Sequence, residues 1–278
     1  MAINWYPGHM VKAKREIKEN LKLVDIVVML LDARAPFSCR NADLEAMAGK
    51  KPIVFILNKM DLAHPGQVKA YKKQLEKDGF AVGVIDSISG KGLKEVLNEL
   101  RKAYEPIAQQ MLDKGRRVRP ARVMVVGVPN LGKSTFLNCM VGKKMAKTGA
   151  KPGVTKGKQW IRVREDIEFM DTPGLMWPKV DNEEQGYKLA LLDIVGENAY
   201  SEYHVALYLI KALQAKAPEV LKEKFKLDSI EGSAEKLLEA ISLKRGHLVK
   251  GGEPDLEKTA KILLQDFRKG NIAHICLD

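Results

Sequence analysis

The sequence predicts two domains of different fold class: an α/β domain over residues 1–178 and a small all-α helical bundle over residues 179–278. In the first part, short apolar runs alternate with segments of helical periodicity, which is typical of a doubly wound, mostly parallel sheet. After Trp177 and Pro178 the strand-like runs disappear and helical spacing continues alone. The length of 278 residues also fits about two domains.

The strands of the α/β domain are predicted from apolar runs that end beside polar segments. The run at residues 52–57 is apolar throughout, as expected for a parallel strand buried on both faces. Further strand-like runs lie at residues 80–85, 122–126 and 167–170. Open α/β sheets bind ligands beyond the carboxyl ends of their strands, so the polar segments after these runs are the candidate site.

The helices are predicted from apolar residues that recur at helical spacing. In the C-terminal part these stripes are Tyr203, Ala206, Leu207, Ile210 and Leu213, then Ala234, Leu237, Leu238 and Ile241, then Leu256, Ala260, Leu263, Leu264 and Phe267. They predict the core of a bundle. An N-terminal helix is predicted to pack through Met10, Ala13, Ile17 and Leu21, with Lys14, Arg15 and Lys18 outward.

A phosphate-binding loop is predicted at residues 127–134, which match the pattern GxxxxGK[ST] between a strand-like and a helix-like run. Glycines at the two ends permit backbone turns in which successive N–H groups surround a phosphate at a helix N-terminus. Lys133 adds a positive charge, and the Ser134 hydroxyl is placed to bind Mg²⁺. The predicted contacts are Val128, Pro129, Asn130, Leu131, Gly132, Lys133, Ser134 and Thr135. The alternative is a chance glycine-rich turn before a helix.

Guanine selectivity is predicted at Asn58, Lys59 and Asp61, which follow the apolar run at residues 52–57. The Asp61 carboxylate can accept two hydrogen bonds from the N1–H and N2 amino edge of guanine, whereas adenine offers no matching donors. Asn58 would brace the loop, and the Lys59 stem would lie along the base. The less specific segment Ser87, Ile88 and Ser89 offers backbone groups to the guanine O6.

The γ-phosphate side is predicted from two later segments. Asp171 follows a strand-like run and would hold Mg²⁺ through the second coordination sphere, and the Gly174 N–H would meet the γ-phosphate. Thr155 would reach Mg²⁺ only in the triphosphate state. A single threonine in a polar loop is normally solvated, so its assignment rests on its neighbours.

The order of these segments is rotated relative to an ordinary small GTPase, because the base-reading segments precede the phosphate-binding ones. Circular permutation is tolerated when it opens the chain at an exposed site, since the termini of compact domains often lie close together. The sequence therefore predicts a circularly permuted P-loop GTPase domain that binds GTP or GDP with Mg²⁺.

This order, the segment at residues 4–10, the segment at residues 32–36 and the segment at residues 266–270 resemble the ribosome biogenesis GTPase A family, also called YlqF or RbgA. The resemblance extends over essentially the whole chain. It implies a GTPase that acts late in assembly of the large ribosomal subunit, binds the subunit precursor (rRNA and ribosomal proteins) in the GTP state, and leaves after hydrolysis that the subunit stimulates.

Catalysis is expected to need help, because Leu175 stands where Ras-like enzymes carry a glutamine that orients water. His9 is one candidate for that role, and the alternative is a surface or capping histidine. Asn130 resembles the asparagine that binds K⁺ in cation-dependent GTPases, and the alternative is an amide that braces the loop.

An RNA partner is predicted from the charge, with 47 Lys and Arg against 35 Asp and Glu, a net charge of +12 and a pI of about 9.4. The tentative RNA contacts are Lys143, Lys144, Lys147, Lys151, Lys156, Lys158, Lys244, Arg245, Arg268 and Lys269. Residues 114–119 form another basic run. Solvated loops and helix ends are the alternative explanation.

The remaining expectations concern compartment and partners. Cys39, Cys139 and Cys276 are far apart and lack metal spacing, as expected in a reduced compartment. The apolar run at residues 26–31 is too short to span a bilayer, and we see no signal-type segment. We expect a cytoplasmic protein that is monomeric off the ribosome, with neither DNA nor a membrane as partner. A GTP-dependent RNA-binding switch in which hydrolysis is incidental is the alternative function.

Overall fold

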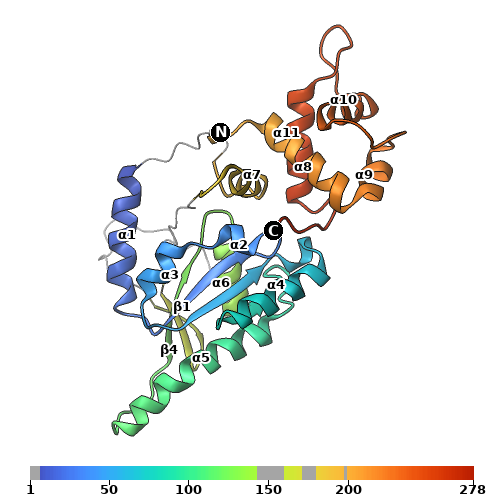
Figure 1. Ribbon diagram of the computed structural model, residues 1–278. Helices are drawn as coiled ribbons and strands as arrows, with labels where there is room; N and C mark the ends of the chain where they lie inside the picture. Colours follow the sequence, from blue (N-terminus) through green and yellow to red (C-terminus); the bar gives the residue numbers. More distant parts are fainter. Residues whose placement is uncertain (1–6, 143–159, 171–179, 197–198) are drawn as a thin grey trace. The chain divides into compact units, whose positions relative to one another are not determined.

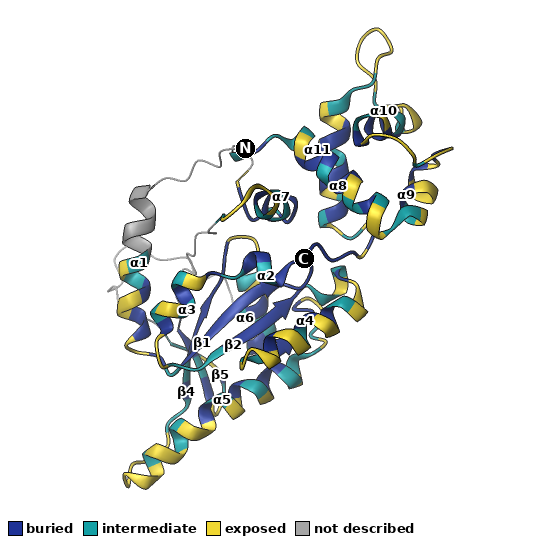
Figure 2. Cartoon of the chain, in the orientation of Figure 1, coloured by how far each residue is buried: buried dark blue, intermediate teal, exposed yellow. Residues whose placement is uncertain are grey.

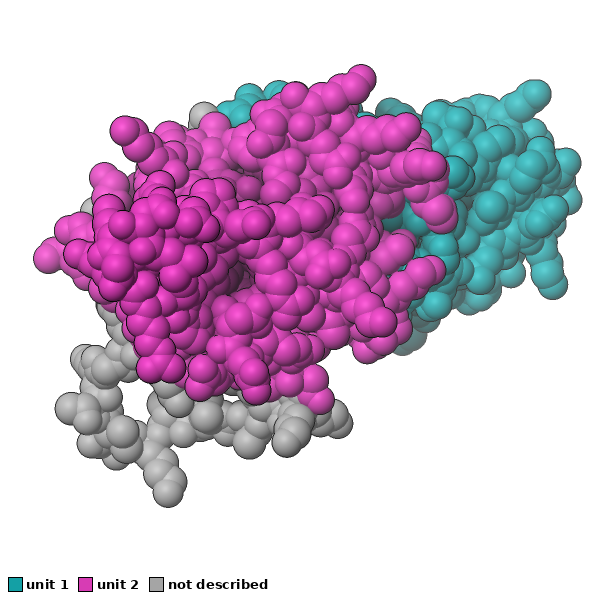
Figure 3. All heavy atoms as spheres, turned by 90° about the horizontal axis from the view of Figure 1, so that it is seen from below, with its two compact units in different colours: residues 1–5, 61–64, 179–278 teal, residues 6–60, 65–178 magenta. Residues whose placement is uncertain are grey.

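The computed structural model of the chain describes residues 7–142, 160–170, 180–196 and 199–278, with side chains from residue 14 onward. The chain divides into two compact units (Figure 3). One comprises residues 6–60 and 65–178, and we call it the sheet unit. The other comprises residues 1–5, 61–64 and 179–278, and we call it the helical unit.

The sheet unit contains a six-stranded sheet in the order β3-β2-β1-β4-β6-β5 (Figure 1). All neighbouring strands are parallel except β5, which is antiparallel to β6. The predicted doubly wound, mostly parallel sheet is confirmed. The strands are β1 (Ile26–Asp32), β2 (Ile53–Asn58), β3 (Ala81–Val84), β4 (Ala121–Val126), β5 (Trp160–Arg164) and β6 (Ile167–Met170).

Helices connect the parallel strands and cover the sheet. They are α1 (Pro7–Leu21), α2 (Pro36–Cys39), α3 (Ala42–Ala48), α4 (Pro65–Lys77), α5 (Leu93–Asp113) and α6 (Lys133–Val141). From β1 to β2 to β3 the chain moves toward one edge of the sheet, and after β3 it returns to β4 on the other side of β1. Parallel crossovers are right-handed, so this reversal places α5 and α6 on the face opposite α3 and α4.

The reversal makes the junction of β1 and β4 the topological switch point of the sheet, where open α/β folds bind their ligands. Every residue of β1 is buried, as expected for a central strand that is covered on both faces (Figure 2). In the pairing of β1 with β2, Asp32 lies opposite Asn58. The last residues of β1 and β2 therefore lie side by side, and Val84 at the end of β3 pairs with Leu57; we call this end of the sheet the carboxyl edge.

The predicted N-terminal helix is present as α1. Ile17 and Leu21 are buried, whereas Arg15 and Lys18 are exposed. Lys14 is only partly exposed, and its ammonium lies 3.0 Å from an Asp43 carboxylate oxygen. The side chains of Met10 and Ala13 lie outside the described residues.

The helical unit contains α7 (Glu183–Leu191), α8 (Glu202–Lys216), α9 (Pro218–Phe225), α10 (Ala234–Arg245) and α11 (Leu256–Arg268). Helix α8 packs against α10 and α11. The predicted stripes supply most of this core; Tyr203 and Leu256 are only partly buried, and Val205 and Leu209 are buried in addition. Within the described part of this unit there is no strand, only an isolated bridge between Leu248 and Pro254.

Four of the helices in this unit begin at side-chain caps, and at α7 the cap is Asn182, which accepts from the Gln185 N–H. Ser201 accepts from the His204 N–H, Ser233 from the Lys236 N–H and Asp255 from the Lys258 N–H. Such caps satisfy donors that a helix N-terminus leaves open, so the starts of these helices are set by local sequence. Within the described ranges, no helix is both long and apolar enough to cross a membrane.

Candidate guanine-nucleotide site

The phosphate-binding loop connects the carboxyl end of β4 to the N-terminus of α6. Its shape depends on glycine at both ends. A Cβ on Gly127 would lie 2.9 Å from the Leu30 carbonyl oxygen, closer than real Cβ atoms approach. Gly132 precedes α6 with a φ of 82°, and Asn130 also takes the left-handed conformation, with a φ of 58°. The loop therefore aims the first turn of α6, which carries Ser134 and Thr135, toward the carboxyl edge.

Lys133 folds its side chain across this loop. The Nζ donates hydrogen bonds of 2.8 Å to the carbonyl oxygens of Gly127 and Val128. Burial lowers the pKa of this ammonium to about 8. A phosphate group beside the loop would favour the charged form, so binding an anion here is coupled to the charge of Lys133.

Asn58 joins three segments that are far apart in the sequence. Its Nδ2 donates 2.8 Å to the Leu131 carbonyl oxygen of the phosphate-binding loop, and its Oδ1 accepts 2.6 Å from the Ser87 hydroxyl. The side chain is buried, so each of these bonds replaces contact with water. The segments predicted to read the base and to bind phosphate are therefore in direct contact through Asn58.

Lys59 makes a second connection between the same segments. It adopts a φ of 59°, and its Nζ donates 2.7 Å to the Asn130 carbonyl oxygen. The same ammonium lies 3.3 Å from Oδ2 of Asp32. These contacts hold the Lys59 ammonium against the phosphate-binding loop.

Asp32 and Arg34 form a buried ion pair behind Lys59, and our sequence reasoning did not assign them to the site. Arg34 donates to both carboxylate oxygens of Asp32 through Nε and an Nη atom, each at 2.9 Å, and through its backbone N–H at 3.1 Å. Burial opposes the charge on Asp32, but Arg34 and Lys59 outweigh burial and lower the pKa of the carboxyl to about 2. Asp32 therefore stays ionised and fixes the position of the Lys59 ammonium.

The segment Ser87, Ile88 and Ser89 is shaped by Asp86, a second residue that sequence reasoning missed. The Asp86 carboxylate accepts from the Ile88 N–H at 2.8 Å and from the Ser89 hydroxyl. Burial opposes ionisation of Asp86, but these hydrogen bonds outweigh it and lower the pKa of the carboxyl. The Ile88 N–H, a backbone group expected to reach the guanine O6, therefore already has an acceptor within the protein. The Ile88 side chain itself is 86% exposed.

Several predicted residues fall outside these contacts. Asp61 lies in the short helix η1 (Met60–Leu62), directly after Lys59 and Met60 in the chain. Thr155, Asp171, Gly174 and Leu175 lie outside the described residues. The backbone of His9 belongs to α1, but its side chain lies outside them as well.

The tentative RNA contacts divide into three groups. Lys143, Lys144, Lys147, Lys151, Lys156 and Lys158 lie outside the described residues. Lys244 and Arg245 form ion pairs with Asp228 and Asp266 at 3.2 and 3.0 Å. Arg268 donates to the carbonyl oxygens of Ala190 and Leu191 at the end of α7 and to the Tyr200 hydroxyl, so the structure gives it an intramolecular role. Lys269 is exposed.

The residues that are described fit a nucleoside phosphate. The loop offers glycine-dependent turns, an ammonium and a helix N-terminus, the combination that binds phosphate groups. The exposed Ser134 hydroxyl lies in the first turn of α6, where it can serve as a ligand for Mg²⁺. When bound, Mg²⁺ would supply positive charge to the phosphate oxygens.

The sheet is mostly parallel, and the phosphate-binding loop after β4 is hydrogen-bonded, through Asn58, to the predicted base-reading segments at the ends of β2 and β3. This arrangement defines a circularly permuted P-loop protein that binds guanine nucleotides. Comparisons with known proteins agree with this class. Residues 122–241 match a family described as 50S ribosome-binding GTPase.

Whole-chain relatives define the family more narrowly. Ribosome biogenesis GTPase A of Bacillus licheniformis is 40% identical over 96% of this chain and 95% of its own length. The protein of the same name from Thermotoga maritima is 32% identical over 99% and 94%. The crystal structure of GNP-bound YlqF from T. maritima matches with a TM-score of 0.67 and 28% identity, over 96% of this chain and 97% of the other. The chain belongs to the ribosome biogenesis GTPase A family.

Proposed function

We propose that this chain binds GTP with Mg²⁺ and hydrolyses it to GDP and phosphate. The observation that carries the proposal is the pair of Asn58 hydrogen bonds, to Leu131 and from Ser87, which unites the base-reading and phosphate-binding segments. Lys133 offsets the charge of the β- and γ-phosphates, and Ser134 binds Mg²⁺. Asp61 reads the guanine edge, and Thr155, Asp171 and Gly174 respond to the γ-phosphate.

The proposed role of this activity is a timing step in late assembly of the large ribosomal subunit. The GTP-bound protein binds the subunit precursor through rRNA and ribosomal proteins, and hydrolysis stimulated by the particle releases it. The family description, the names of the relatives and the net charge of +12 support this role. A monomeric state off the ribosome and a cytoplasmic location belong to the same proposal.

Intrinsic hydrolysis is proposed to be slow, because Leu175 cannot hydrogen-bond the attacking water. His9 would orient that water once the particle positions it, and K⁺ held near Asn130 would offset developing phosphate charge. Turnover measured in KCl and in NaCl tests the cation, since equal rates would remove it from the mechanism.

Single-turnover hydrolysis with and without purified large subunits tests the function. We expect strong stimulation by the large subunit and little by the small one, which serves as the control particle. If the protein bound the large subunit only with GTP, and the subunit did not stimulate hydrolysis, the protein would instead be an RNA-binding switch. If calorimetry showed that ATP binds as tightly as GTP, the proposed selectivity for guanine would be wrong.

A further inference from the structure

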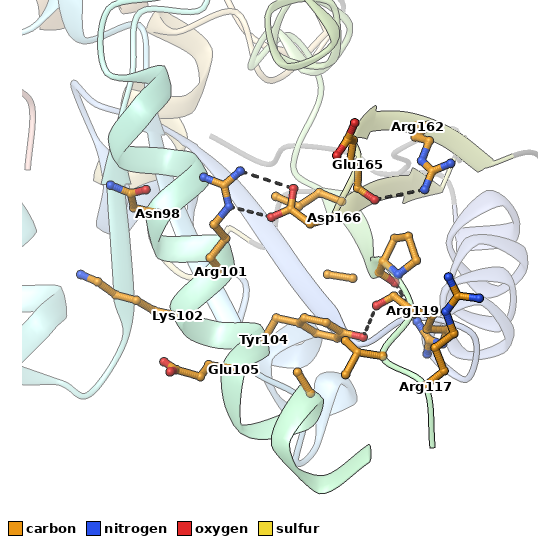
Figure 4. Close-up of a pocket in the computed structure, with 15 residues that line it drawn as sticks. Asn98, Arg101, Lys102, Tyr104, Glu105, Arg117, Arg119, Arg162, Glu165 and Asp166 are labelled. Atoms are coloured by element: carbon orange, nitrogen blue, oxygen red, sulfur yellow. Dashed lines mark hydrogen bonds and ion pairs between the residues drawn. The ribbon is translucent and has the colours of Figure 1, made fainter. Parts of the chain in front are cut away.

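A second concave site lies at the opposite end of the sheet unit from the nucleotide site. It is formed by the middle of α5, the segment that leads into β4 and the turn between β5 and β6 (Figure 4). Its volume is about 1080 Å³, slightly above the roughly 300–1000 Å³ range of ligand clefts. We call it the amino-edge pocket, because it adjoins the first residues of β4 and β6.

The rim of the amino-edge pocket is rich in cations. Five cationic side chains line it against three acidic ones: Arg101, Lys102, Arg117, Arg119 and Arg162 against Glu105, Glu165 and Asp166. Arg101 is paired with Asp166 at 2.7 Å, and Arg119 is paired with Asp25 at 2.7 Å. Figure 4 shows Arg117 on the segment that enters β4.

The basic run that contains Arg117 is held in place by the end of α5. Gly115 takes a φ of 65°, and its N–H and that of Arg116 donate to the carbonyl oxygens of Leu112 and Met111. The side chains of Arg116 and Arg117 are exposed, and within the described ranges neither has a hydrogen-bond or ion-pair partner. Arg117 thus lines the pocket from a fixed turn, and Arg116 precedes it in the chain; the donors of both guanidinium groups are available to an anion.

The inner surface of the pocket is apolar. It is lined by the Tyr104 ring, Ala108, Val118, Pro120 and Ile167. The Tyr104 hydroxyl donates 2.8 Å to the Arg119 carbonyl oxygen, which fixes the ring (Figure 4). Val118 is 38% exposed and therefore offers apolar surface to a ligand.

We propose that the amino-edge pocket binds an unpaired nucleotide of RNA, with the base against the apolar lining and the adjacent phosphates on Arg116 and Arg117. Splayed-out bases on apolar or aromatic surfaces flanked by guanidinium groups are the usual form of single-stranded RNA recognition. The exposed guanidinium groups of Arg116 and Arg117, at adjacent positions of the chain, favour a ligand that carries phosphate groups. This inference rests on the proposed function, in which ribosomal RNA is a partner, and it names the surface of the protein that contacts that RNA.

The pocket is separate from the GTP site. Strand β4 runs from Ala121, which lines the pocket, to Val126, which precedes the phosphate-binding loop. At about 3.3 Å per residue, these ends are roughly 17 Å apart. Substitutions on the pocket rim should therefore leave GDP binding unchanged, and GDP affinity serves as the folding control.

The test is binding of the full chain to a single-stranded RNA of about 12 nucleotides that carries 4-thiouridine. The double variant R116E/R117E should bind on the order of tenfold more weakly, and the slope of log Kd against log salt should fall by about 1.4 or more. The matched control K69E/K73E makes the same change of charge on exposed positions of α4 and should bind as the unchanged protein does. Ala108→Phe, which adds a bulky ring to the pocket lining without changing charge, should obstruct the base, weaken binding about fivefold or more and leave the slope unaltered.

Photo-crosslinks from 4-thiouridine should map to residues of the pocket lining. If R116E/R117E and Ala108→Phe both leave RNA binding unchanged, RNA is a partner of the protein but does not bind at this pocket. If the unchanged protein bound neither the oligonucleotide nor large-subunit rRNA, both the pocket proposal and the proposed function would be wrong. A photoreactive residue at position 118 that cross-links to a ribosomal protein and not to rRNA would identify a protein site instead.

Discussion

The two ends of the sheet unit carry ion pairs of the same chemistry in opposite environments. At the carboxyl edge, the side chains of Asp32 and Arg34 are 0% and 1% exposed. At the amino edge, those of Asp166 and Arg101 are 49% and 48% exposed. A buried pair is expensive to separate, whereas a solvated pair exchanges readily with water and ions. Burial therefore fixes the charges at the carboxyl edge, whereas the exposed Arg101–Asp166 pair at the amino edge can exchange with water and ions.

The largest expected effect is that of Asp32→Asn. It leaves the buried Arg34 guanidinium without its counter-charge, so we expect the free energy of unfolding to fall by about 3–5 kcal/mol. Denaturant unfolding of the GDP-free protein measures it. The double variant D32N/R34M removes both charges and should recover part of the loss, since a buried pair is often replaceable by apolar groups. A loss below about 1 kcal/mol for Asp32→Asn would contradict the contrast between the edges.

The next effect is that of Asn58→Ala on nucleotide affinity. This change leaves the Leu131 carbonyl and the Ser87 hydroxyl without their partner in a buried position, which costs about 1–3 kcal/mol. We expect GDP affinity, measured by calorimetry, to weaken by a corresponding amount. Asn98→Ala, at an exposed position of α5, is the matched control and should have no effect. Equal affinities for the two variants would show that Asn58 does not organise the site.

A smaller, graded effect is expected from pH. The pKa of Lys133 is about 8 in the protein, and a bound phosphate raises it. Below pH 8 the lysine is charged with and without nucleotide, so affinity is constant. Above pH 8 binding requires uptake of a proton, so the Kd for GDP should rise by up to about tenfold per pH unit.

This dependence is measured by titrations between about pH 7 and pH 9, below the ionisation of guanine. Lys133→Met should bind weakly with a flat profile over the same range. If the Kd of the unchanged protein for GDP did not vary over this pH range, burial would not lower the pKa of Lys133 to about 8.

The smallest effect is that of Asp166→Asn at the amino edge. The lost partner of Arg101 is half-exposed, so the guanidinium stays hydrated and the free energy of unfolding should change by only about 0–1 kcal/mol. Denaturant unfolding beside Asp32→Asn gives the direct comparison of the two edges. A loss as large as that of Asp32→Asn would remove the distinction between them.

Much of the nucleotide site could be predicted from the sequence because its signals are local. The loop at residues 127–134 carries glycines, a lysine and a serine at fixed spacing between a strand and a helix, and the structure places it there. Asn58 and Lys59 follow an apolar strand, and the parallel sheet delivers them to the same edge. The helical stripes likewise gave most of the core of the helical unit.

No local sequence pattern predicts the roles of Asp32 and Asp86 or the amino-edge pocket. Asp32 acts on Lys59 only because β1 and β2 pair with Asp32 opposite Asn58, and no local pattern states that register. The pocket likewise combines α5 with the β5–β6 turn, about 60 residues later in the chain.

The sequence alone determined which segments are expected to contact phosphate and base, and their order in the chain, because short motifs dictate their own backbone geometry. The tertiary structure decided which charges stand behind those segments and which face solvent. Burial and strand register set the strength of each ion pair, and both arise only when distant parts of the chain pack together.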